Sequence, residues 1–172
     1  MQLFAQDFEK SPKQYSLELG YRYNFSSNFV NNASSGYGML FDYAWQLSGF
    51  KNKKAAYISV PLGYTSLMPN SATDKRASIL SYGWTVRHEL AKGKSTIPYI
   101  GYCLLLNQYR ESGTDGSIFG HQTKFDFGFN FKAQSKFKPY AKLEYSYTRY
   151  PRFGNKESYK VHAAEVKLGI RY

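Results

Sequence analysis

Residues 124–132 read K-F-D-F-G-F-N-F-K, in which every second residue is a phenylalanine. In an extended chain successive side chains point to opposite faces, so the four phenylalanines share one face. The charged residues, the glycine and the asparagine share the other face. A period of two over nine residues predicts a β-strand with one apolar and one polar face.

The same period recurs in seven further segments, separated by links rich in Asn, Ser, Gly, Asp and Pro. No stretch of useful length has a helical period, and the longest apolar run is only residues 103–106, too short for a transmembrane helix. Regularly spaced strands with turn signals predict an all-β antiparallel meander in one domain. The eight segments are residues 15–25, 37–48, 56–65, 79–90, 97–108, 121–132, 139–149 and 159–172.

The links between the segments alternate in length. Three are short, and four are longer and richer in turn-forming residues. We therefore expect short turns at one end of the sheet and longer loops at the other. The short links are residues 49–54, 91–96 and 133–138, and the longer ones are 26–36, 66–78, 109–120 and 150–158.

The polar faces carry six acidic and seven basic residues, Lys132 among the latter, although the whole chain has a formal net charge of +11. A closed lumen needs such a balance, because unpaired charges away from water are costly. The apolar faces carry so many rings that they would overfill a soluble core. The pattern favours an eight-stranded up-and-down transmembrane β-barrel over the alternative, a soluble lipocalin-like barrel or sandwich. The predicted lumen charge network comprises Glu18, Arg22, Asp42, Arg87, Glu89, Lys124, Asp126, Lys142, Glu144, Glu165, Lys167 and Arg171.

Several glycines also fall on the polar faces. The interior of an eight-stranded barrel is narrow, so glycines there are expected to make room for long Arg and Lys side chains. The bulky rings on the opposite faces, many near strand ends, predict aromatic girdles at the two lipid interfaces. The glycines are Gly20, Gly38, Gly83, Gly101, Gly128 and Gly169.

The final stretch, residues 167–172, reads K-L-G-I-R-Y. It resembles the C-terminal assembly signal of bacterial outer-membrane β-barrels, with Tyr172 in place of the commoner phenylalanine. Gly169, Ile170 and Tyr172 match that signal, and the eight segments resemble the small OmpX/OmpA-type barrels over residues 14–172. The resemblance implies the outer membrane as location, the barrel assembly machinery as partner, periplasmic termini and outward-facing longer loops. Residues 1–13 would form a periplasmic tail, with residues 1–5 as the remnant of a signal peptide.

These features favour a structural or interaction role for the chain. It would contact outer-membrane lipids and lipopolysaccharide, or serve as a subunit of an envelope complex with other proteins. A narrow channel for small solutes is an alternative. Nucleic-acid binding is not expected despite a pI of 9.6, because the basic residues alternate with rings or lie in separate turns. Candidate lipopolysaccharide contacts are Lys75, Arg76, Arg110, Arg149, Arg152 and Lys156.

The second alternative is a lipid A-modifying hydrolase. His121 and Thr123, which share the outward face of their segment, loosely resemble the His-x-Ser pair of the lipid A 3-O-deacylase family. Threonine replaces serine, however, and no outward-facing carboxylate lies nearby to orient the histidine. An ordinary interfacial role for His121 is therefore favoured, and an enzyme is not the main expectation. Three dispersed histidines and one cysteine predict no metal site, and no cofactor is expected.

Overall fold

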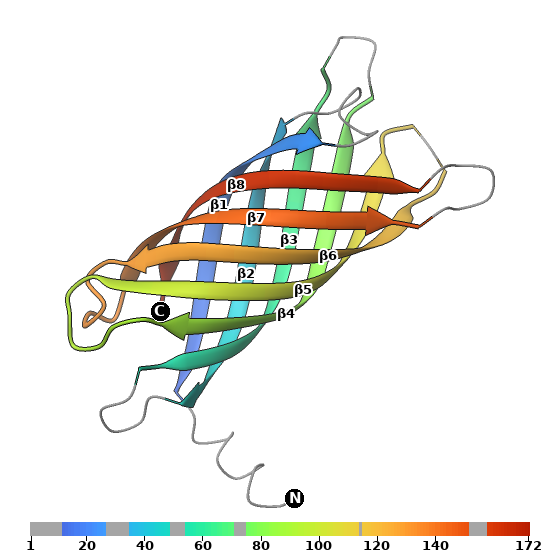
Figure 1. The fold of residues 1–172 in the computed structure, drawn as a ribbon. Coiled ribbons are helices and arrows are strands. Elements are labelled where there is room, and N and C mark those ends of the chain that lie inside the picture. Colours follow the sequence, from blue (N-terminus) through green and yellow to red (C-terminus); the bar gives the residue numbers. More distant parts are fainter. Residues whose placement is uncertain (1–11, 27–34, 49–53, 71–74, 114, 152–157) are drawn as a thin grey trace, which may run out of the picture.

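The computed structural model describes residues 12–26, 35–48, 54–70, 75–113, 115–151 and 158–172. They form a closed antiparallel barrel in which each strand pairs with its sequence neighbour and the last strand pairs with the first (Figure 1). The predicted fold class is thereby confirmed. The strands are β1 (Lys13–Ser26), β2 (Ser35–Ser48), β3 (Ala56–Met68), β4 (Ala77–Glu89), β5 (Ile97–Glu111), β6 (Ile118–Asn130), β7 (Lys138–Tyr150) and β8 (Tyr159–Arg171).

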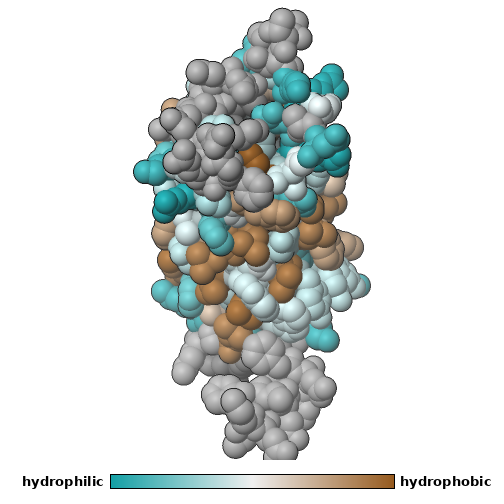
Figure 2. All heavy atoms as spheres, turned by 90° about the vertical axis from the view of Figure 1, so that its right-hand side faces the viewer, coloured by the Kyte–Doolittle hydropathy of each residue, from teal (hydrophilic) through white to brown (hydrophobic). Residues whose placement is uncertain are grey.

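The barrel wall is inverted relative to a soluble protein. Large apolar side chains face outward, as shown by Leu143 and Leu168, which are 62% and 64% exposed. The residues between them on each strand are buried and mostly polar or charged. Figure 2 shows apolar residues gathered around the middle of the visible face, with strongly hydrophilic ones towards its upper end. This arrangement is the one expected of a wall that meets lipid.

The connections differ from the sequence expectation. The predicted length difference was wrong, since every connection spans six to eight residues. The strands continue into the polar links because backbone pairing does not require apolar side chains: Ser66 pairs with Ser78, and Tyr109 pairs with Ile118. Strands of 13 to 15 residues exceed the roughly 9–11 needed to cross a bilayer, so their ends extend beyond the apolar band.

The two ends of the barrel are named by their connections. The loop end carries the links 27–34, 69–76, 112–117 and 151–158, and the turn end carries 49–55, 90–96 and 131–137. β1 begins and β8 ends at the turn end (Figure 1). The described residues contain no helix long and apolar enough to cross a membrane. Residues 1–11 of the predicted tail 1–13, which include the signal-peptide remnant 1–5, lie outside the described part of the chain.

Candidate functional site

Three lysines and three glutamates from four strands form a central ion cluster in the lumen. Lys142 Nζ lies 2.9 Å from Glu18 Oε2, and Lys124 Nζ lies 3.2 Å from Glu165 Oε1. Their side chains are at most 7% exposed, so each charge depends on its neighbours rather than on water. The cluster comprises Glu18, Lys124, Lys142, Glu144, Glu165 and Lys167.

Strand register explains the shape of the central ion cluster. Lys142 lies directly opposite Lys167, and Glu144 lies directly opposite Glu165. Like charges in facing positions repel. The salt bridges therefore run diagonally between strands, as from Lys167 to Glu144, or along one strand, as from Lys142 Nζ to Glu144 Oε1 at 3.2 Å. Every charge is satisfied only when β7 and β8 hold this register.

All residues of the predicted charge network are buried inside the barrel except Glu89, which is half-buried near the turn end. Lys132 was wrongly counted on the polar face: it is exposed in the turn 131–137, where its φ is 48°. The chain has already left the strand at Asn130, so the period of two no longer applies there.

Towards the loop end the lumen loses its charges. Arg22 is the outermost buried ion; its Nη1 lies 2.8 Å from Glu165 Oε1, and its Nε donates to Asn24 Oδ1 at 2.8 Å. An uncharged polar layer and then an apolar cluster follow, so the loop end is closed by packed side chains. The polar layer contains Asn107, Gln122, Ser146 and Thr148, and the apolar cluster contains Leu67, Ala77, Ile79, Tyr109, Tyr150 and Val161.

At the turn end, two arginines stack on buried tyrosine rings. The Arg171 guanidinium lies 3.7 Å from the ring centroid of Tyr140 and 4.5 Å from that of Tyr99. The Arg87 guanidinium lies 4.3 Å from the ring centroid of Tyr57. Cation–π contacts of this kind gain strength when both partners are desolvated. The sequence interpretation did not place these tyrosines in the lumen. Tyr99 lies two residues before Gly101, and Tyr140 lies two residues before Lys142, so the period of two would have assigned both rings to the lumen.

Two of the six predicted lumenal glycines make room for the Tyr99 and Tyr140 rings. A Cβ placed on Gly128 would lie 2.5 Å from Tyr99 Cζ, and one on Gly169 would lie 2.5 Å from Tyr140 Cζ. The expected neighbour, a long cationic chain, is present at Gly20, where Lys167 Cγ lies 2.5 Å from the Cβ position. Close packing of rings on cross-strand glycines is a common way to fill a curved sheet.

A small cavity lies beside the central ion cluster. Its volume is about 20 Å³, enough for one water molecule or ion. Cys103, Asp42 and Asp126 contribute to its wall. Cys103 is buried and lies opposite Lys124 on β6, so it faces the lumen rather than the lipid.

On the outer wall at the loop end, three basic side chains lie in one row across β6, β7 and β8. His121 pairs with Arg149, and Arg149 pairs with Lys160. All three are exposed. We call His121, Arg149 and Lys160 the cationic row.

An aromatic patch lies next to the cationic row, two residues further along each strand towards the middle of the wall. Tyr147 and His162 are cross-strand partners there, and their ring centroids are 4.9 Å apart. Tyr145 Oη lies 2.6 Å from His162 Nδ1, and the Phe25 ring stacks near both. The hydrogen bond keeps two polar groups paired on a wall that is otherwise apolar.

The structure separates the predicted catalytic pair from any acid. His121 is exposed and Thr123 is half-buried on the same wall. Among the described residues, the carboxylates within the strands point into the lumen or lie at strand ends; Glu111, for example, accepts a hydrogen bond from Tyr109 Oη at 2.9 Å. The described wall around His121 therefore contains no carboxylate that could orient the imidazole.

The predicted lipopolysaccharide contacts fall into two groups at the loop end. Arg149 belongs to the cationic row, whereas Arg110 lies on β5 and Arg76 directly precedes its partner strand β4. Arg76 O accepts a hydrogen bond of 2.8 Å from Ser112 N. Lys75, Arg76, Arg110 and Arg149 are all exposed. The other two candidates, Arg152 and Lys156, lie outside the described residues.

The residues matched to the assembly signal take up different environments on β8. Ile170 and Tyr172 are exposed on the outer wall, and Tyr172 exchanges two backbone hydrogen bonds of 2.8 Å with Tyr15. The Lys136 ammonium lies 4.5 Å from the ring centroid of Tyr172. Gly169 faces the lumen. Their role in assembly stays a prediction.

No protein-family model matches the chain, and no curated protein matches its sequence. Solved structures do match its fold. Neisserial surface protein A aligns with a TM-score of 0.69 and 15% identity over 92% of this chain and 95% of its own. The outer membrane enzyme PagL aligns with a TM-score of 0.55 and 14% identity, covering 90% and 97% respectively.

A third match is Ail, the attachment invasion locus protein of Yersinia pestis, in complex with the heparin analogue sucrose octasulfate. Its TM-score is 0.52 at 14% identity, with 93% of this chain and 99% of that chain covered. At such identities the likeness concerns the fold alone. The chain has the fold of the eight-stranded bacterial outer-membrane β-barrels.

Proposed function

We propose that this chain is an outer-membrane barrel with a filled, non-conducting lumen, whose outer wall binds the phosphates of lipopolysaccharide. The observation that carries the proposal is the cationic row, in which His121, Arg149 and Lys160 occupy facing positions on three adjacent strands. The proposal places the loop end outside the cell, as the resemblance to OmpX/OmpA-type barrels implies.

The cationic row calls for an anionic partner. Facing residues have Cβ atoms about 4.5–5.5 Å apart, and like charges at that distance repel. Within the described residues, neither Arg149 nor Lys160 forms a salt bridge. A phosphate above the row would accept charge-assisted hydrogen bonds from both side chains and remove their repulsion.

The neighbouring aromatic patch supports a lipid headgroup as the source of that phosphate. Tyr and other amphipathic rings concentrate where hydrocarbon meets headgroups. Rows on the same face of a strand are about 6.6–6.8 Å apart, so the cationic row lies just on the headgroup side of Tyr147 and His162. Acyl chains would then lie along the apolar wall below, where Phe125 and Leu143 are 57% and 62% exposed.

The filled lumen supports a structural rather than a conducting role. The central ion cluster occupies its middle, and the apolar cluster that includes Leu67 and Tyr150 closes its loop end. Cavities of about 20 and 10 Å³ lie between these side chains, each too small for a solute larger than water. A subunit role in an envelope complex stays a prediction, which pull-down from solubilised outer membranes would test.

The experiment is a binding titration of the refolded chain in phospholipid nanodiscs with bisphosphorylated lipid A and with its dephosphorylated form. The variant Arg149→Gln/Lys160→Gln removes two charges, each contributing about 1 kcal/mol near an anionic surface. We expect its affinity for bisphosphorylated lipid A to fall about 30-fold, since 1.4 kcal/mol is tenfold.

The matched control is Lys92→Gln/Lys94→Gln, which removes the same charge from an exposed turn at the opposite end. We expect the control to bind like the wild type, and the dephosphorylated lipid to bind both variants equally. Equal loss in the two double variants would indicate a bulk charge effect and contradict a site at the cationic row. Mass spectrometry of lipid A before and after incubation tests the hydrolase alternative, which predicts the loss of an acyl chain.

A further inference from the structure

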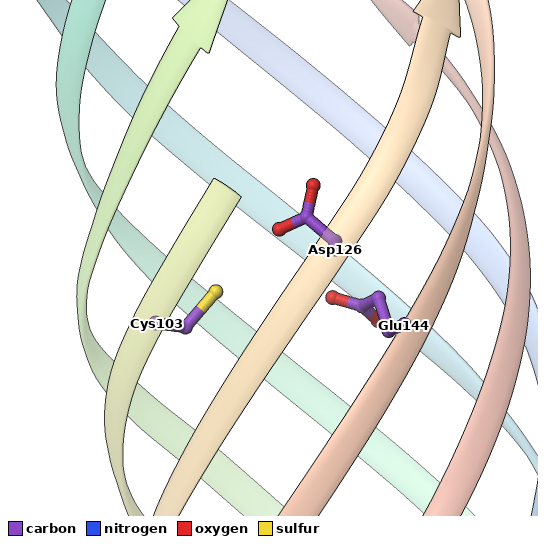
Figure 3. Close-up of side chains that lie close together, drawn as sticks. All are labelled: Cys103, Asp126 and Glu144. Carbon is purple, nitrogen blue, oxygen red and sulfur yellow. The ribbon is translucent and has the colours of Figure 1, made fainter. Parts of the chain in front are cut away.

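Three potential metal ligands converge on the cavity beside the central ion cluster. Cys103 on β5, Asp126 on β6 and Glu144 on β7 project from neighbouring strands towards one space (Figure 3). The Cys103 Sγ and one carboxylate oxygen from each acid lie within 4.8 Å of one another, and all three residues are buried. The sequence predicted no metal site, because it offered only dispersed histidines and one cysteine.

Asp126 is a buried carboxylate that takes no part in the ion pairs of the lumen. Its side chain is only 7% exposed, yet it forms no salt bridge and no hydrogen bond with another described side chain. By contrast, Glu18, Glu144 and Glu165 each contact at least two lysines or arginines. A buried carboxylate without a partner is costly, so it calls for a cation, a proton or a water in the adjacent space.

A second carboxylate faces the same cavity. Asp42 on β2 is 7% exposed, lines the cavity, and leaves its Oδ1 without a hydrogen-bond partner. Gly101, which faces Asp126 across β5 and β6, has no side chain, so the Asp126 carboxylate packs directly against its backbone. The cavity therefore presents one thiol and four carboxylates, two of which, Asp42 and Asp126, form no salt bridge among the described residues. Four basic side chains also line it: Arg87, Lys124, Lys142 and Arg171.

We propose that this cavity binds a divalent transition metal of the Zn²⁺ class, with Cys103, Asp126 and Glu144 as ligands. A thiolate combined with carboxylates suits Zn²⁺ better than Mg²⁺ or Ca²⁺, which prefer oxygen alone. Binding displaces the thiol proton to solvent as the metal–sulfur bond forms. A cavity of about 20 Å³ leaves room for the ion or for a water that completes four-coordination.

The geometry needs only a small contraction. In a tetrahedral site, Zn–S and Zn–O bonds of about 2.3 and 2.0 Å place sulfur and oxygen about 3.5 Å apart. The present upper separation of 4.8 Å would close by about 1.3 Å, shared between side chains on neighbouring strands. Lys124 and Lys142 also contact Glu144, at 3.8 and 3.2 Å, and a carboxylate has lone pairs for both a lysine and a metal. Their positive charge makes the site weaker than an all-thiolate site.

The test uses the full chain, reduced and refolded in detergent micelles, with Co²⁺ as a spectroscopic probe and Zn²⁺ in competition. The metal is added during refolding in one sample and afterwards in another, because the lumen is closely packed. We expect one Co²⁺ per chain with a thiolate-to-cobalt charge-transfer band. Cys103→Ser should abolish the band, and Asp126→Asn should weaken binding at least tenfold.

The matched control is His88→Gln/His121→Gln/His162→Gln, which removes the histidines of the outer wall that could bind metal adventitiously. We expect it to keep the band and the affinity. Circular dichroism and heat-modified gel migration establish that each variant is folded. The proposal is overturned if no charge-transfer band appears under either regimen, or if binding survives Cys103→Ser and is lost in the histidine variant.

Discussion

Lys167 on β8 reaches diagonally to the carboxylate of Glu144 on β7, although the residue directly opposite Lys167 is another lysine, Lys142. Glu144 also receives Lys142 and Lys124, so one carboxylate joins β6, β7 and β8. A shift of one residue between β7 and β8 would place these charges on the lipid side. The buried ion pairs therefore specify the register of the barrel as well as fill its lumen.

Glu144→Gln removes the carboxylate from three lysines without changing side-chain volume. Loss of one partner from a buried ion pair typically costs about 3–5 kcal/mol, because the remaining charge is left uncompensated. We expect the free energy of unfolding in urea, measured in detergent micelles, to fall by about that amount.

The control for Glu144→Gln is Lys92→Gln, which lies in an exposed turn and should change the unfolding free energy by less than about 0.5 kcal/mol. The double variant Glu144→Gln/Lys167→Met should lose less unfolding free energy than the sum of its single changes, because it also removes one of the lysine charges that Glu144→Gln leaves without a partner. A loss below about 1 kcal/mol for Glu144→Gln would show that the central ion cluster does not stabilise the barrel.

Gly169→Ala places a methyl group 2.5 Å from Tyr140 Cζ and 2.7 Å from the backbone oxygen of Leu17. Overpacking of this kind typically costs about 1–3 kcal/mol. We expect a loss in that range in urea unfolding of the refolded protein. Gly116→Ala is the control, because no described atom lies within 4 Å of its Cβ position.

Refolding in vitro separates packing at Gly169 from a role in the assembly signal, because no assembly machinery is present there. If Gly169→Ala has the unfolding free energy of the wild type in vitro, the packing of the Tyr140 ring does not require a glycine at position 169. Adding Tyr140→Ala to Gly169→Ala should then give no interaction between the two changes, whereas the packing account predicts that the clash is partly relieved.

Planar-bilayer recording tests the closed lumen. We expect no unitary conductance steps from the wild-type barrel across a wide voltage range, because the apolar cluster at the loop end and the central ion cluster both obstruct the lumen. Reproducible steps from independent preparations, absent from mock-purified samples, would support the narrow-channel alternative instead.

The sequence contained enough information for the fold and for the inward side of each strand. The period of two in residues 124–130 predicts which side chains share a face, and the absence of charge from the middle of the apolar faces predicts which face meets lipid. Strand ends were harder to predict, because Ser66 and Ser78 pair through their backbones whatever their side chains prefer.

The candidate sites depend on cross-strand register, which periodicity alone does not supply. Nothing in the sequence places Arg149 beside both His121 and Lys160, or Asp126 beside Glu144, until the strands are aligned. Likewise, the period of two assigns Tyr140 to the lumen, but only the three-dimensional structure shows the Arg171 guanidinium stacked on its ring. The sequence therefore predicted which side of the barrel wall each residue faces, whereas it did not predict which residues lie next to each other across the strands.

The central claim is that the apolar wall of this barrel lies in lipid, and Trp84 tests it most directly. Trp84 is 57% exposed at the middle of β4, and Trp45→Phe leaves it as the sole tryptophan. In vesicles of lipids brominated at defined acyl positions, we predict strongest fluorescence quenching near the bilayer centre and little quenching by aqueous iodide. Strong quenching by iodide with none by brominated lipid would contradict the account.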